Sequence, residues 1–181
     1  MSFRQLPPEA LRILKQYGAA PRLIAHLTVV HDVAYTLTQL LLDSWPELAY
    51  DREAVLLGSA LHDIGKTMHT AELSGPGTQH EEVGPQLLLA TDLPVAYARF
   101  ARTHARWQNE PGITLEDMLV AFADTIWKGK RDADLEQGLA GQIAQHTHQE
   151  RWEIYMRLDD IASALARDAD ERILWQGQHT I

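Results

Sequence analysis

Apolar residues recur every three or four positions along most of the chain, the period of a helix with one buried face. This spacing predicts a short amphipathic helix over residues 7–17 and a longer helix from Pro21 to about Asp43. Further helices are predicted from Arg52 to about His62, from about Gln79 to Ala90, from Pro94 to just beyond His104, and over residues 115–127. From Asp132 onwards the same period predicts two helices or one long bent helix.

The predicted fold is an all-α helical bundle of roughly seven or eight helices, because no segment shows sustained two-residue alternation. Helix starts are marked by candidate capping residues, Asp51 and Thr114, and by Thr78 with Glu81 in a capping-box pattern. Between them, Gly75, Pro76 and Gly77 predict an irregular loop. We expect residues 1–181 to form a single domain.

The amino-acid composition excludes several kinds of functional site. The chain has 45% hydrophobic and 23% charged residues, as soluble globular proteins do. It has no cysteine, so disulfides, thiolate zinc sites and cysteine nucleophiles are excluded, and any metal ion must be held by His, Asp or Glu. The net charge of −9 disfavours non-specific binding to nucleic acid. No signal peptide or membrane-spanning stretch is recognisable, so the cytoplasm is the expected location, with no membrane partner.

The segment GSALHDIGK, residues 58–66, is the strongest candidate for a functional motif. His62 and Asp63 follow an apolar helix end, where burial of both groups costs free energy unless a bonding partner compensates for the lost water. Neutral imidazole and ionised carboxylate are both suitable ligands for a divalent metal ion. The alternative is that His62 is a hydrogen-bonded core histidine and Asp63 a helix C-terminal residue. Gly65 is expected to let the backbone turn away, which leaves Lys66 near the carboxylate.

Four other ionisable residues stand beside apolar residues, at helix ends or on inward faces: His26, His80, His104 and Asp124. Asp124 interrupts the apolar run LVAFADTIW, so we expect it to bind a cation, or else to pair with Arg131. His26 lies on the inward face of its predicted helix, whereas His31 lies about 140° further round. His26 is therefore the preferred first ligand, and His31 the alternative.

In order and context, His26, His62–Asp63 and Asp124 resemble the H…HD…D signature of the HD-domain superfamily of metal-dependent phosphohydrolases, over roughly residues 21–130. The resemblance implies a helical bundle around a metal site. His80 and His104 resemble the extra histidines of members that bind two metal ions. By this resemblance His26, His62, Asp63 and Asp124 would hold one ion, and Asp63, His80 and His104 the other. The helices over about 132–176 would pack on this core or form the contact of a homodimer.

We therefore predict one or two divalent transition-metal ions, drawn from Fe, Mn, Ni, Co and Zn. The predicted reaction is attack of a metal-bound hydroxide on the phosphoester of a small molecule, with a nucleotide as the favoured substrate. Asp63 and Lys66 are the candidate catalytic residues. Lys66, Lys128, Lys130 and Arg131 are the candidate substrate-binding residues, although each could instead be a solvated charge at a helix end. Two other functions stay open, a di-iron oxygenase and a nucleotide-binding sensor without turnover.

Overall fold

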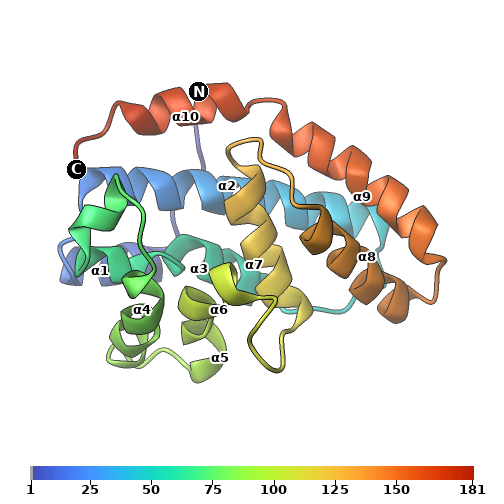
Figure 1. Ribbon diagram of the computed structural model, residues 1–181, viewed down its shortest axis with the longest axis horizontal. Coiled ribbons are helices and arrows are strands. Elements are labelled where there is room, and N and C mark those ends of the chain that lie inside the picture. The colour runs from blue at the N-terminus through green and yellow to red at the C-terminus, as the bar shows by residue number, and fades with distance from the viewer. Residues whose placement is uncertain (1) are drawn as a thin grey trace.

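The computed structural model describes residues 2–181, which form ten α-helices and two 3-10 helices and contain no β-strand. The predicted all-α fold is confirmed (Figure 1). In chain order the elements are α1 (Pro8–Gln16), α2 (Pro21–Ser44), α3 (Arg52–Leu61), η1 (Ile64–Thr67), η2 (Thr70–Leu73), α4 (Gln79–Leu89), α5 (Val95–Ala98), α6 (Phe100–Arg106), α7 (Leu115–Ile126), α8 (Ala133–Thr147), α9 (Arg151–Ala166) and α10 (Ala169–Gly177).

The helix count is higher than predicted because two predicted segments are divided. The helix expected from Pro94 is split at Arg99 into α5 and α6. The carboxy-terminal region forms three helices, not one or two. Here His148 adopts a left-handed conformation, with φ of 55°, and ends α8. Since a left-handed residue cannot continue a right-handed helix, the apolar period alone could not show this break.

The helix starts agree with the predicted capping residues at two of three places. The Asp51 side chain accepts from the Ala54 N–H at 2.9 Å, and Thr114 forms a capping box with Asp117. The capping box predicted at Thr78 does not form. Instead the Glu72 carboxylate, brought over by the preceding loop, accepts from the Gln79 N–H at 3.0 Å. A carboxylate from the preceding loop thus replaces the predicted cap of Thr78.

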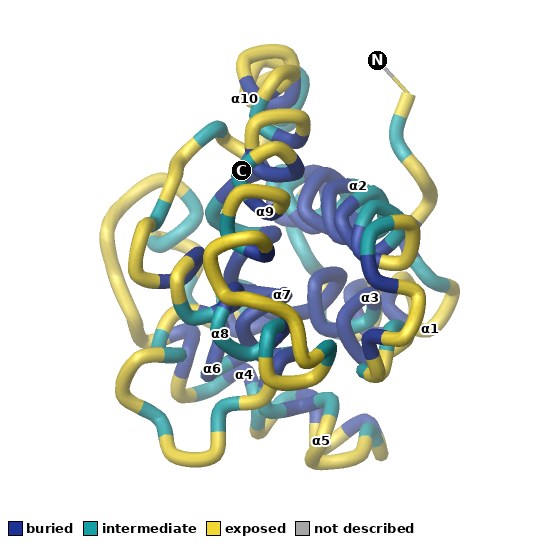
Figure 2. The backbone as a smooth tube through the Cα atoms, turned by 90° about the vertical axis from the view of Figure 1, so that its right-hand side faces the viewer, coloured by how far each residue is buried: buried dark blue, intermediate teal, exposed yellow. Residues whose placement is uncertain are grey.

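The long helix α2 is the central element of the bundle, and α3, α7, α9 and α10 all pack against it. One cluster of buried apolar side chains joins α2, α3, α7, α8 and α9, and a second joins α1, α2, α3, α4 and α6. In Figure 2 the buried residues gather on α2, α3 and α7, while α10 is largely exposed on its outer side. The ends of α2, α3 and α7 that matter for function are thereby held by a packed core.

Gly65 has a role in packing that the sequence did not predict. It is not among the glycines with positive φ, so no left-handed conformation requires glycine at this position. A Cβ atom at Gly65 would lie 2.1 Å from the backbone oxygen of His80. Glycine is therefore needed because α4 approaches η1 more closely than any side chain allows. This contact brings the first turn of α4 to the end of α3.

Among the described residues, no helix combines the length and apolarity needed to cross a membrane.

Candidate metal centre

The structure brings the six predicted ligand residues together from five helical segments. His26 comes from α2, His62 and Asp63 from the end of α3, His80 from the first turn of α4, His104 from α6 and Asp124 from α7. Five of them line one cavity of about 320 Å³, and His62 is fully buried behind it. Residues up to 98 positions apart in the sequence thus share one site.

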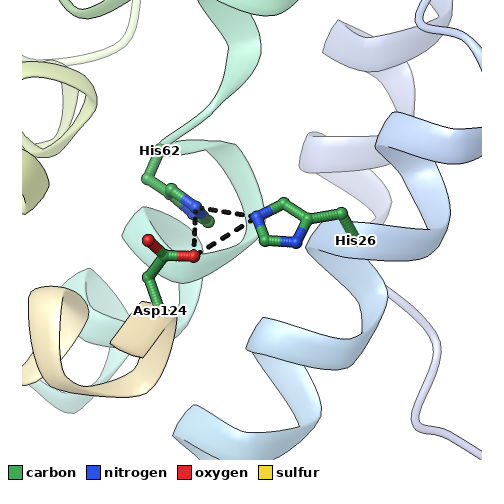
Figure 3. A group of neighbouring side chains, drawn as sticks. All are labelled: His26, His62 and Asp124. Atoms are coloured by element: carbon green, nitrogen blue, oxygen red, sulfur yellow. Dashed lines mark hydrogen bonds and ion pairs between the residues drawn. The ribbon is translucent and has the colours of Figure 1, made fainter. Parts of the chain in front are cut away.

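His26, His62 and Asp124 form one half of the site (Figure 3). The Nε2 atoms of His26 and His62 are 3.3 Å apart. The Asp124 Oδ1 atom lies 3.3 Å from each of these two nitrogens. Two nitrogens and one carboxylate oxygen therefore face a common point, as the ligands of a metal ion do.

Asp63 links this half to a second one. Its Oδ2 atom lies 3.1 Å from His26 Nε2, whereas its Oδ1 atom lies 3.1 Å from His80 Nε2 and 3.7 Å from His104 Nε2. Oδ1 is buried and accepts no well-formed hydrogen bond from residues 2–181. A buried carboxylate oxygen without a hydrogen-bond donor is costly unless a cation binds it. The donor set and this unpaired oxygen both fit a divalent metal ion.

The other ring nitrogen of three histidines is already engaged. His62 Nδ1 lies 3.0 Å from the Ser59 carbonyl oxygen, and His104 Nδ1 lies 3.0 Å from the Phe100 carbonyl oxygen. Because a carbonyl oxygen only accepts, each Nδ1 carries the proton and each Nε2 keeps its lone pair for the site. His80 Nδ1 lies 2.5 Å from a Glu72 carboxylate oxygen instead.

The charges in the site agree with this arrangement. Burial opposes ionisation of Asp63 and Asp124, but the surrounding imidazoles, led by His62, hold the pKa of both carboxyl groups well below the ordinary value. Burial and the neighbouring His62 lower the pKa of His104 to about 4, so its imidazole is neutral at pH 7. For His26 and His80 burial acts in the same direction, yet hydrogen bonds to carboxylates outweigh it and raise both pKa values.

The predicted substrate-binding residues are not all at the site. Lys66 lines the cavity, and its Nζ atom lies 2.5 Å from Asp63 Oδ2. Lys128 is exposed and lines the same cavity, whereas exposed Lys130 does not.

Arg131 does not line the cavity, and its guanidinium pairs with Glu136 and Asp159 at 2.6 Å each. These pairings also exclude the predicted alternative in which Arg131 neutralises Asp124.

His31, the alternative first ligand, lies elsewhere. It is buried, its Nδ1 atom is 3.1 Å from the Leu56 carbonyl oxygen, and it lines a different surface groove. Its burial lowers its pKa. The geometry therefore favours His26 over His31.

The sequence interpretation missed three residues that the structure places in or beside the site: Arg22, Glu72 and Gln176. Only Arg22 had a local indication, since it precedes His26 by one helical turn on the same face. Glu72 lies in the segment taken as irregular, and Gln176 lies outside the predicted core of residues 21–130. Their proximity depends on tertiary packing.

Comparison with known proteins adds two findings. The family model described as HD domain matches residues 10–126. A relative, the tRNA (cytidine(56)-2'-O)-methyltransferase of Thermoplasma volcanium, is 27% identical over 141 residues. This match covers 70% of the present chain but only 38% of the relative, so the chain spans well under half of that protein's length. No solved structure gives a significant match.

The family match includes the HD pair, His26, His80, His104 and Asp124, which are also the residues that meet at the cavity. The chain therefore belongs to the HD domain family.

Proposed function

We propose that this chain is a metal-dependent phosphohydrolase that cleaves the phosphoester of a small molecule, with a nucleotide as the favoured substrate class. The observation that supports the proposal best is the position of Asp63. Its two carboxylate oxygens face different histidine pairs, His26 with His62 and His80 with His104. This is the arrangement expected of a carboxylate shared by two metal ions.

The donor atoms of these residues already lie close to one another. His26, His62 and Asp124 would hold one ion, and His80 and His104 the other, with Asp63 between them. Divalent ions bound there would lower the pKa of water to about 7 and would so supply hydroxide at neutral pH. The proposed role of the protein is to hold six donors in place from a packed core, so that no ligand must be ordered when the substrate arrives.

Lys66 is the proposed catalytic cation. Its ammonium group lies against Asp63 and borders the cavity. There it would bind an oxygen of the reacting phosphate and stabilise the negative charge that develops on it. Lys128, at the cavity rim, would add to the attraction of an anionic substrate to a chain of net charge −9. Lys130 is a weaker candidate for this role, and Arg131 is no longer proposed for it.

Methyl transfer is not proposed for this chain. The methyltransferase relative is matched over 38% of its length, and its name describes the whole protein. The site described above is made of metal-ligand side chains, which methyl transfer to a hydroxyl does not require. The substrate screen described below tests whether this chain acts on a nucleotide.

The proposal is tested by elemental analysis of the purified protein together with the Asp63→Ala variant. We expect about two transition-metal ions per chain in the unsubstituted protein, loss of metal from Asp63→Ala, and normal metal content in Asp134→Ala, which alters an exposed residue of α8. A screen of nucleotides and other phosphoesters should then give metal-dependent phosphate release.

Absence of bound metal, even after reconstitution with Mn, Fe or Zn, would refute the proposal. Two other outcomes point to the remaining functions. Recovery of iron with oxygen consumption coupled to substrate loss would indicate the di-iron oxygenase, whose donor set would be the same. Tight nucleotide binding without turnover, with both metal ions present, would indicate a sensor.

A further inference from the structure

The carboxy-terminal helix α10 forms part of the cavity wall, although it lies outside residues 10–126, the extent of the family match. It packs along the beginning of α2, as Figure 1 shows. Its Gln176 lines the same cavity as His26 and Asp63. One wall of the site is thus made by a segment that the HD domain match does not include.

Two arginines attach this segment to the helices that carry the ligands. Arg172 of α10 is buried and donates from Nη1 to the Trp127 carbonyl oxygen at 2.8 Å, directly after α7. Arg22, in the first turn of α2, donates from its backbone N–H to the Thr180 carbonyl oxygen at 2.8 Å and from Nη1 to the Gln176 carbonyl oxygen at 3.1 Å. Residues 169–180 therefore connect the start of α2 with the end of α7.

The guanidinium of Arg22 has N–H groups that make no hydrogen bond within the described residues. It lines the cavity, and its Nε atom is buried without a hydrogen-bond partner among residues 2–181. The bond to Gln176 uses one of its five N–H groups. In contrast, Arg102, Arg106 and Arg131 each pair with two carboxylates. A partly buried cation with unused donors at a cavity is suited to an anionic ligand.

Arg22 borders the cavity from α2, whereas Lys66 borders it from η1. It precedes His26 by four residues, which is about 6 Å along the axis of α2. Lys66, in contrast, touches Asp63 itself. A phosphate at the metal ligands would be met by Lys66, so Arg22 would meet a part of the substrate further out.

We propose that Arg22, held in place by α10, binds a second, non-reacting anionic group of the substrate. The carboxy-terminal helix is then the element that selects phosphoesters with two separate anionic groups. This inference rests on the proposed phosphohydrolase function for the position of the reacting phosphate. It adds a substrate class and a specificity-determining residue that the family match does not assign.

The test is equilibrium binding of two non-hydrolysable probes to the metal-loaded protein, measured by calorimetry. Benzylphosphonate carries one anionic group, and 4-carboxybenzylphosphonate carries a second one across the ring. We expect the unsubstituted protein to bind the carboxylated probe more tightly. Arg22→Gln should remove this preference, on the order of tenfold to a hundredfold in the dissociation constant, and leave benzylphosphonate binding and metal content unchanged.

Two further variants locate the effect. Arg12→Gln, at an exposed arginine of α1 that pairs with Glu9, should keep the full preference. Arg172→Met, which loosens α10 from α7, should reduce the preference while metal content persists. Retention of the preference in Arg22→Gln, or equal weakening of both probes, would overturn the inference. Because the probes only bind, loss of the preference in Arg22→Gln combined with no turnover of any phosphoester would refute hydrolysis alone.

Discussion

Among single residues, Asp63 and Glu72 show how carboxylates serve two different purposes in this site. Asp63 faces four imidazoles, with Nε2 atoms of two of them near each of its carboxylate oxygens. Glu72 accepts from the Nδ1–H of His80, on the side of the ring opposite to Nε2, so we expect it to orient a proposed ligand without being one. His62 and His104 are oriented by backbone carbonyls, so His80 alone of these three depends on a side chain.

This difference predicts that removal of Glu72 affects one of the two proposed metal positions. Glu72→Ala should weaken the binding of one ion about 10- to 100-fold, because His80 loses the partner that fixes its ring and its protonated nitrogen. The other ion should bind with unchanged affinity. Titration of the metal-free protein with Zn²⁺, followed calorimetrically, measures both affinities.

The matched control is Glu82→Ala, two residues from His80, because Glu82 is exposed and pairs with Arg102 and Arg106 outside the cavity. It should leave both affinities unchanged. Equal weakening of both ions in Glu72→Ala would show that Glu72 supports the fold of the loop and not the orientation of His80.

Among the elements, η1 and α4 determine whether His80 reaches Asp63, because they pack against each other at Gly65. Helix α4 packs against η1 so closely that the His80 backbone occupies the space of a side chain at position 65. The loop between them returns Glu72 to the start of α4. His80 therefore reaches Asp63 through packing of two elements that are separate in the sequence.

Gly65→Ala is accordingly expected to destabilise the protein by about 1–3 kcal/mol, the usual cost of overpacking, and to lower its melting temperature by several degrees. The added Cβ would press on the His80 backbone, which cannot move aside as a side chain could. We also expect weaker binding of the ion held by His80. Thermal unfolding and metal titration measure the two effects.

Gly141→Ala is the control, because the nearest atoms to its Cβ belong to the Arg151 side chain at 3.8 Å, an ordinary contact. In the middle of α8 this change should leave stability unchanged or slightly raise it. If Gly65→Ala melted at the same temperature as Gly141→Ala, the close approach of α4 to η1 would be refuted.

For the whole molecule, the metal-free site concentrates charged and polar groups at the meeting point of five helical segments. Both carboxylates are ionised, and His26 and His80 take up protons more readily than ordinary histidines. Metal binding therefore competes with protonation of these two imidazoles. The pKa values of His26 and His80 are higher in the folded protein than the value of 6.5 in the unfolded chain. Protonation of these imidazoles therefore stabilises the metal-free fold fully below pH 6.5. This stabilisation is lost as the pH rises through the raised pKa values of the folded state.

Both effects make the metal-dependent gain in stability larger at high pH. Removal of metal by a chelator should lower the melting temperature at pH 8, by an amount that corresponds to about 2.7 kcal/mol when the free metal is 100 times its dissociation constant. At pH 6 the same removal should cost less, because protons already occupy His26 and His80. Calorimetric melting with and without chelator at the two pH values measures the difference, and a larger loss at pH 6 would contradict the assignment of these ligands.

The sequence by itself determined the class of fold and the types of side chain available to the candidate site. Helical periodicity and capping residues are local properties, so the extents of α2, α3 and α7 could be predicted to within a few residues. The absence of cysteine restricted metal ligands to His, Asp and Glu, and the HD pair in its apolar setting identified the centre of the site. The same local rules failed at Arg99 and His148, where the chain breaks its helices despite continuing apolar spacing.

Only the tertiary structure decided which charges meet. It placed His26 and not His31 beside His62, since α2 turns only one face toward the site. It paired Arg131 with Glu136 and Asp159, and it brought Glu72 to His80 and α10 to Arg22. Each of these contacts joins residues from different segments, and the free energy of such a pairing depends on burial and on competing partners. Spacing along the chain determines neither, so the ligand types followed from the sequence and their partners from the packing of the helices.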